Sequence, residues 1–267
     1  MARIVHGKVN ITTNEYTIIA DMALDAAALG FSVAERRIFR DNDRDVRVLD
    51  GVDGNMHLLV LGDREGSYEG MFKFASITKI ESFGSQLAGT TKIDLTDAIK
   101  QAYIAATEID PEDYNIFFTF SNSLVLDGKH VFILKIMRAY YFDKVGMLSV
   151  DLSSGEVTLE LMDLTEVAPE GLDTSILLTL NGFLDGSVFW SAGYSYNSSN
   201  LPTMYELVDG NITRVFRRTA RVTNITPDGL FFATDGVYKI VNDTLQYVSE
   251  NYTHGLEYNS QKLGVYR

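Results

Sequence analysis

Residues 127–134 of the chain read Asp-Gly-Lys-His-Val-Phe-Ile-Leu, a turn dipeptide followed at once by an apolar run. Asp-Gly supplies the positive backbone angles that a two-residue hairpin turn requires. Because the run is apolar at consecutive positions, both faces of the strand that it predicts should be buried. The stretch therefore predicts the inner part of an antiparallel sheet that is covered on both sides.

The same unit occurs four times along the chain. Its other copies are Asp53-Gly54 before residues 56–61, Asp185-Gly186 before residues 188–190, and Asp228-Gly229 before residues 230–233. Successive Asp-Gly turns are 74, 58 and 43 residues apart, which fits a repeat of one small sheet with insertions. We expect the four turns to occupy equivalent places in successive sheets.

A second predicted hairpin follows each of the last three units. It pairs residues 147–151 with 156–161, residues 204–208 with 212–216, and residues 237–241 with 245–248. Four antiparallel strands per repeat are typical of a β-propeller blade, in which the neighbouring blades cover the inner strands. Residues 150–158, Val-Asp-Leu-Ser-Ser-Gly-Glu-Val-Thr, resemble the third and fourth strands of many propeller blades. The resemblance is to the architecture and implies no single family.

The two ends of the chain each predict one further hairpin. Arg3–Val5 and Lys8–Thr12 flank Gly7, and Leu256–Tyr258 precedes Leu263–Tyr266. Pairing these two hairpins in one sheet would remove exposed sheet edges. We therefore predict one all-β, propeller-like domain over residues 1–267, with about five four-stranded blades. A β-sandwich with helical insertions would use the same hairpins and is the alternative.

Two segments predict helical insertions, at about residues 16–40 and 94–110. In the second, Thr96–Ile109 is rich in alanine, has a helical period and ends before Pro111. In the first, the segment is interrupted at Gly30 and its N-terminal half is rich in alanine. We expect the helix at Thr96–Ile109 to lie outside the sheets.

The composition narrows the classes of partner. The chain has 36 acidic and 23 basic residues, a net charge of −13, which opposes direct nucleic-acid binding. It has no cysteine, so disulfides and thiolate chemistry are excluded. The first apolar stretch, Ile18–Val33, carries Asp21 and Asp25. We therefore predict neither a signal peptide nor a membrane span.

Motifs for common enzyme chemistry are missing from the sequence. It contains no phosphate-binding loop, dinucleotide fingerprint, zinc-protease motif or nucleophile elbow. Its four histidines, at positions 6, 57, 130 and 254, are scattered without metal-ligand spacing. We predict a protein that is not an enzyme and that needs no cofactor.

The sharpest candidate for a metal site is the alternating set Asp41, Asp43 and Asp45, which resembles the start of a calcium loop. The sixth position of such a loop should be glycine and is Val46, and the twelfth should be glutamate and is Val52. A solvated turn whose acids neutralise the neighbouring arginines is the favoured interpretation.

A basic cluster opposes the overall charge of the chain. It comprises Arg214, Phe216, Arg217, Arg218 and Arg221. Arginine and aromatic side chains are enriched in protein interfaces, which makes the cluster a candidate protein interface. In the alternative interpretation, these charged residues protect an outer strand from stacking on other sheets.

We therefore predict a non-enzymatic structural or adaptor subunit of an oligomeric assembly, with other protein subunits as partners. The acidic, cysteine-free composition resembles that of bacteriophage virion and tail proteins, which implies a place in the virion; otherwise we expect the cytoplasm. The alternatives are a carbohydrate-binding propeller module and a five-bladed propeller enzyme that cleaves glycosides. A lectin would repeat aromatic sites in every blade, whereas Trp190 is the only tryptophan.

Overall fold

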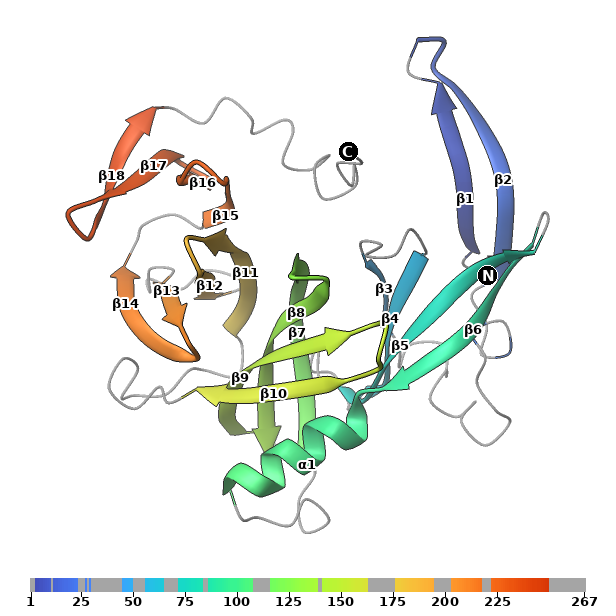
Figure 1. Cartoon of the computed structure of the whole chain (residues 1–267), viewed down its shortest axis with the longest axis horizontal. Coiled ribbons are helices and arrows are strands. Elements are labelled where there is room, and N and C mark those ends of the chain that lie inside the picture. The colour runs from blue at the N-terminus through green and yellow to red at the C-terminus, as the bar shows by residue number, and fades with distance from the viewer. Residues whose placement is uncertain are drawn as a thin grey trace. The chain divides into compact units, whose positions relative to one another are not determined.

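A computed structural model describes residues 3–10, 12–23, 27, 29, 45–49, 56–64, 72–83, 86–107, 116–138, 141–162, 176–194, 203–217 and 222–249. The chain divides into two compact units. The first comprises Met1–Gln101 with Leu152–Val157, and the second comprises Ala102–Asp151 with Thr158–Arg267. Both units are mostly β-structure (Figure 1). The single domain that the sequence predicts over residues 1–267 stays a prediction.

The first unit contains a four-stranded antiparallel sheet and a hairpin. The sheet runs in the order β3-β4-β5-β6, and β2 of the hairpin meets β6 in a parallel bridge between Asp21 and Gln86. The bounds are β1 Arg3–Asn10, β2 Glu15–Ala23, β3 Asp45–Leu49, β4 Met56–Arg64, β5 Phe72–Phe83 and β6 Gln86–Asp94.

The second unit contains three successive groups of four antiparallel strands, as the four-strand repeat predicts, and the second and third groups are each a separate sheet (Figure 1). The first consists of β7 Ile116–Leu126, β8 Lys129–Arg138, β9 Tyr141–Asp151 and β10 Val157–Met162. The second consists of β11 Ile176–Leu184, β12 Ser187–Tyr194, β13 Thr203–Val208 and β14 Asn211–Arg217. The third consists of β15 Val222–Ile225, β16 Leu230–Ala233, β17 Gly236–Val241 and β18 Thr244–Ser249.

The Asp-Gly turns lie between the first and second strands of these three sheets, as the repeat predicts. Asp127-Gly128 and Asp185-Gly186 have positive φ at both residues, the geometry of a two-residue hairpin turn. Asp228-Gly229 differs because Pro227 precedes it: the Gly229 N–H donates to the Thr226 carbonyl, and only Gly229 has positive φ. Asp53-Gly54 lies outside the described residues, between β3 and β4.

The middle sheet of the second unit is buried on both faces, as its apolar runs predict. One face, with Trp190 and Tyr205, packs against β8 residues such as Val131. The other face, with Phe189 and Met204, packs against Phe231 and other residues of the third sheet. Adjacent residues of one strand point to opposite faces, so two apolar cores share this sheet.

Asparagine side chains connect the first strands of neighbouring sheets. At a β-bulge in β7, the Asn122 side chain donates to the Leu180 carbonyl at 2.8 Å and accepts from the Leu180 N–H at 2.9 Å. At the equivalent bulge in β11, Asn181 donates to the Val222 carbonyl at 2.7 Å. A glycine beside this bulge permits close approach, since a Cβ at Gly182 would lie 2.8 Å from the Ile225 Cβ.

The predicted helix at Thr96–Ile109 is confirmed as α1, Thr96–Thr107. The Asp94 side chain accepts the Thr96 N–H, and the Thr96 hydroxyl bonds the backbone of Ala75 in β5. Its buried side chains include Ile99 and Tyr103. Ala105 and Ala106 are exposed.

The prediction of a helix at residues 16–40 is wrong over its first part, because Glu15–Ala23 forms strand β2. Tyr16-Thr17-Ile18-Ile19 favours a strand, and pairing with β1 outweighs the alanines that follow. Residues 24–40 lie outside the described residues except positions 27 and 29. The hairpin predicted within Arg3–Thr12 is also wrong. Arg3–Asn10 is one strand with a bulge at His6 and Gly7, and its partner is β2.

The predicted C-terminal hairpin, Leu256–Tyr266, lies outside the described residues. Closure of the fold by the two termini and the count of five blades therefore stay predictions. In the part of the chain that the structure describes, no helix is long and apolar enough to cross a membrane.

Candidate functional site

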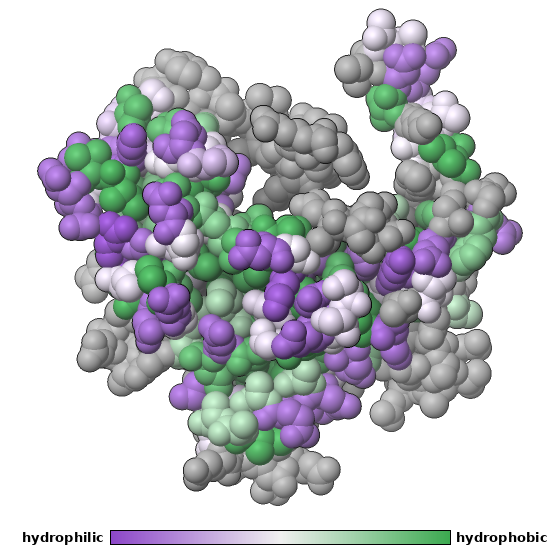
Figure 2. All heavy atoms as spheres, in the orientation of Figure 1, coloured by the Kyte–Doolittle hydropathy of each residue, from purple (hydrophilic) through white to green (hydrophobic). Residues whose placement is uncertain are grey.

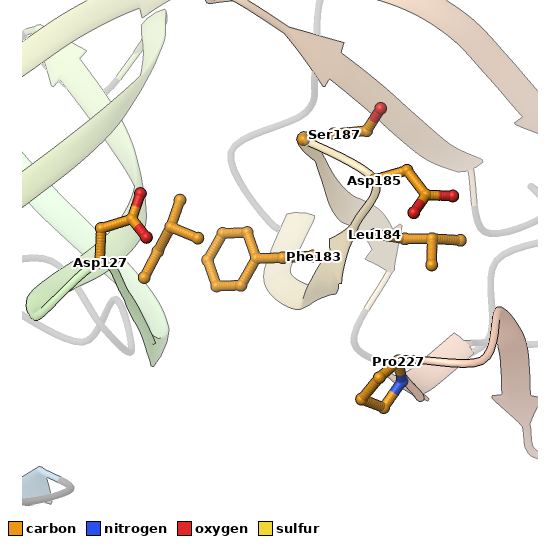
Figure 3. Close-up of a pocket in the computed structure, with 8 residues that line it drawn as sticks. Asp127, Phe183, Leu184, Asp185, Ser187 and Pro227 are labelled. Atoms are coloured by element: carbon orange, nitrogen blue, oxygen red, sulfur yellow. The ribbon is translucent and has the colours of Figure 1, made fainter.

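A pocket of about 310 Å³ in the second unit is lined by residues of the Asp127 and Asp185 turns and by Pro227 (Figure 3). Residues from all three sheets line it. They are Leu126 and Asp127 from the first sheet, Phe183, Leu184, Asp185, Gly186 and Ser187 from the second, and Pro227 from the third. Two of the turns that the sequence repeat identifies, at Asp127 and Asp185, therefore contribute to the pocket.

The apolar lining continues the two cores of the unit to the surface. Leu126 and Phe183 pack against the core between the first and second sheets. Leu184 packs against the core between the second and third sheets. Since Phe183 and Leu184 are adjacent in β11, they point to opposite faces and line the pocket from both cores. In Figure 3 the Phe183 ring points toward the side of the pocket that carries Asp127.

Two carboxylates stand at the rim of this apolar lining. Asp127 and Asp185 are exposed, and each occupies the first central position of its hairpin turn with a φ of about 50°. Figure 3 shows them on opposite sides of Phe183. The lining of the pocket therefore contains apolar side chains and two exposed carboxylates.

The buried polar side chain among the lining residues, Ser187, is already hydrogen-bonded within the fold. Ser187 is buried, and its hydroxyl donates to the Glu206 Oε1 atom at 2.8 Å. Glu206 is only 3% exposed and also accepts two hydrogen bonds from the Arg214 guanidinium, one from Nη2 at 2.8 Å and one from Nε. Arg214 Nη1 reaches Asp243 of the third sheet at 2.7 Å.

This ion cluster sets the protonation of its members. The hydrogen bond from Arg214 is the largest effect and lowers the pKa of Glu206 below its ordinary value of 4.5; burial opposes this effect, and the Ser187 hydroxyl supports it. The hydrogen bond to Glu206 in turn raises the pKa of Arg214. The cluster is therefore a fixed ion pair that links the second and third sheets.

The residues of the predicted basic interface have separate positions. Arg214 is bound to Glu206 and Asp243, with its guanidinium carbon 5.8 Å from the centre of the Phe216 ring, and Phe216 is buried. Both belong to β14, the last strand of its sheet. The side chain of Arg217 and the whole of Arg218 and Arg221 lie outside the described residues, so the interface stays a prediction for those three.

The predicted metal residues are only partly described. Asp45 accepts a hydrogen bond from the Arg47 Nε atom at 2.8 Å, which agrees with the favoured interpretation of an acid that neutralises a neighbouring arginine. Asp41 and Asp43 lie outside the described residues. No three His, Asp or Glu side chains of the described ranges gather in a way that could hold a metal ion.

A second candidate surface lies on the β1–β2 hairpin of the first unit. Val9, Tyr16 and Ile18 are 61%, 55% and 58% exposed. Val9 pairs with Tyr16, and Gly7 pairs with Ile18, so the three side chains share one face of the hairpin. The Tyr16 ring lies over Gly7, where an added Cβ would be 2.6 Å from the ring. We call this the hairpin face; Figure 2 shows hydrophobic residues among hydrophilic ones on the projecting hairpin.

The sequence indicated the turns of the pocket but not the pocket itself. The spacing of Asp-Gly dipeptides identifies equivalent turns, whereas their convergence depends on how the sheets pack. The Glu206 to Arg214 pair was also missed. The sequence could have indicated this pair, because the two residues flank the Asp209-Gly210 turn and an antiparallel hairpin places them opposite each other.

Comparison with known proteins gives distant structural neighbours only. No family model and no curated protein matches the chain. The β-propeller domain of Nup133 from Vanderwaltozyma polyspora superposes with a TM-score of 0.42 and 10% identity, over 93% of this chain and 66% of that domain. A GH43_1 enzyme from Xanthomonas citri complexed with xylotriose gives a TM-score of 0.40 and 13% identity, over 77% of this chain and 73% of the enzyme.

Proposed function

We propose that the protein is a non-enzymatic structural or adaptor subunit that joins other protein subunits in an assembly. The hairpin face carries this proposal. Three large apolar side chains that are more than half exposed on one face of a hairpin form the kind of patch that marks a protein contact. A bacteriophage virion remains the assembly that the composition predicts.

The way the second unit uses its polar groups supports a scaffold. Asn122 and Asn181 bind the backbone of the next sheet, and Arg214 joins Glu206 to Asp243. These contacts hold three sheets in a fixed arrangement. A rigid body of this kind suits a subunit whose exposed turns and hairpins make the contacts.

The glycoside-cleaving alternative needs a carboxylic acid with a raised pKa that can protonate the leaving group. Glu206, the buried carboxylate among the described residues of the second unit, has its pKa shifted in the opposite direction by Arg214. A carboxylate whose pKa is lowered by a bound arginine is a poor general acid. This observation favours the adaptor over the enzyme.

Sedimentation velocity and electron microscopy of the purified full chain test the proposal. We expect a defined oligomer, and we expect Ile18→Asn to weaken its association by about tenfold, which corresponds to the loss of one buried apolar side chain at a contact. Val48→Asn is the matched control, because Val48 is 64% exposed on another strand of the same unit. A chain that stays monomeric at its highest soluble concentration, or that hydrolyses glycosidic bonds of oligosaccharides, would overturn the proposal.

A further inference from the structure

We propose that the outer face of the third sheet is the docking site of the segment that follows it in the chain, residues 250–267. The outer face is the surface of β15–β18 that points away from the second sheet. Residues 250–267 lie outside the described residues. Three observations support the docking site: the side chains of the face, its counterparts in the two preceding sheets, and the course of the chain.

The outer face carries apolar side chains of the two inner strands. Phe231 of β16 packs toward the second sheet, so its neighbours Leu230 and Phe232 point the opposite way. Phe232 pairs with Val237 of β17, which places Val237 on the outer face as well. Val241, four residues further along β17, lies on the same face and is 38% exposed.

The equivalent faces of the two preceding sheets are covered by the next sheet. Val131, Phe189 and Phe232 each lie three residues after the glycine of their Asp-Gly turn. Val131 is 2% exposed and packs against the second sheet, and Phe189 is 1% exposed and packs against the third. Phe232 holds the same position but is half-buried, and no further sheet follows the third in the described part of the chain. Because an apolar sheet face is stabilised by a second layer, we expect β-structure to cover this face too.

The course of the chain identifies the cover. Each covered sheet is followed at once by the strands that cover it: residues 163–175 lead from β10 to β11, and residues 218–221 lead from β14 to β15. The same progression leads from Ser249, the end of β18, into residues 250–267. A second copy of the chain offers the same side chains, but a segment joined to the sheet is present at a much higher effective concentration.

A single hairpin supplies enough apolar surface for such a cover. Trp190 of the β11–β12 hairpin and Phe231 of the β15–β16 hairpin are the large side chains inserted against the preceding sheets. The sequence after Ser249 predicts one hairpin, within residues 256–266. Its apolar residues alternate along both strands, which gives the hairpin one apolar face; they are Leu256 and Tyr258 on the first strand and Leu263 and Val265 on the second.

A nitroxide label on the outer face of the full chain tests the proposal. The chain has no cysteine, so one introduced cysteine gives a unique attachment point. Lys239 is exposed and pairs with Leu230, which places a label at Lys239→Cys on the outer face. We expect this label to cause loss of the backbone amide NMR signals of residues 256–266 in the same molecule. Thr158→Cys, at an exposed position of β10, is the matched control and should leave those signals unchanged.

A change in the segment itself tests whether apolar contact holds it. Leu263→Asp should restore the lost signals in the chain labelled at Lys239→Cys, because docking would bury an unpaired charge. Asn259→Asp, in the predicted turn of the same hairpin, should not restore them. Signals that stay lost in Leu263→Asp would overturn the proposal.

A mixed sample separates this segment from a second copy. Isotope-labelled chains without nitroxide are combined with nitroxide-labelled chains that carry no isotope, so only contacts between molecules cause loss of signal. We expect no loss in this sample. A loss equal to that within one molecule would mean that a second copy covers the face, and would overturn the proposal. Retention of the signals of residues 256–266 in Lys239→Cys, or an equal loss in Thr158→Cys, would also overturn it. None of these outcomes depends on the proposed adaptor function.

Discussion

At the scale of single residues, Glu206 shows how a buried charge becomes a structural element. It lies on β13, almost fully buried, where an unpaired carboxylate would cost several kcal/mol. Arg214 and Ser187 satisfy both of its oxygens, and Arg214 extends the contact to Asp243, which is 82% exposed. The exposed ion pair between Arg214 and Asp243 adds little to the free energy of unfolding, since surface ion pairs contribute at most about 1 kcal/mol.

The lowered pKa of Glu206 predicts a specific dependence of stability on pH. A carboxyl whose folded pKa lies below its unfolded value stabilises the fold above the unfolded value, near 4.5, and loses that contribution as the pH falls through the folded value. Glu206→Gln should therefore lower the free energy of unfolding by about 1.5–3 kcal/mol at neutral pH. Urea denaturation should show that this difference shrinks below about pH 4.5.

Asp243→Asn is the control for that measurement. It removes the exposed partner of Arg214 and should change the free energy of unfolding by less than about 1 kcal/mol. A difference between the wild type and Glu206→Gln that stays constant from neutral to acidic pH would contradict the assignment.

At the scale of strands and sheets, asparagines in β-bulges set the contact between neighbouring sheets. Asn122 bonds both backbone groups of Leu180, and Asn181 bonds the carbonyl of Val222. The third sheet has Thr223 at the equivalent bulge, and its hydroxyl donates within its own sheet, to Phe232. The asparagine link therefore occurs twice in the described residues and ends at β15.

We predict that Asn122→Ala lowers the free energy of unfolding by about 1–3 kcal/mol, because it leaves the Leu180 N–H and carbonyl without these partners. Urea denaturation measures the loss. Asn211→Ala is the control: Asn211 donates to the Asp209 carbonyl, two residues away in the same turn, so its loss should stay within about 0.5 kcal/mol. Equal losses in the two variants would show that the link to Leu180 does not hold the sheets.

The sequence correctly predicted the elements that are determined by residues close together in the chain. The turns at Asp127, Asp185 and Asp209, the hairpins beside them and helix α1 all follow from residues within a few positions of each other. The segment after Tyr16 was misread, because alanines suggested a helix while the deciding interaction is pairing with β1. The pocket and the Asn122 link join residues about 58 positions apart, which local patterns do not report.

At the scale of the second unit, the shared middle sheet should make the three sheets unfold together. Trp190 points into the core with the first sheet, and Phe189, its neighbour, points into the core with the third. Loss of either core exposes one face of the same four strands. Since each sheet contributes to a core that it cannot form alone, partial unfolding leaves large apolar surface in water.

This coupling can be measured because Trp190 is the only tryptophan of the chain and lies in the core that Phe231 does not touch. Phe231 is buried and packs edge to face on Phe189 with ring centroids 5.3 Å apart. Phe231→Ala should cost about 3–5 kcal/mol. If the sheets unfold together, the urea midpoint from Trp190 fluorescence should fall by the same amount as the midpoint from far-ultraviolet circular dichroism.

Phe83→Ala, at a ring that is 57% exposed, should move neither midpoint appreciably. A Trp190 transition that stays in place while the circular dichroism signal is lost earlier would mean that the third sheet unfolds alone, and that the two cores are energetically independent despite the sheet that they share.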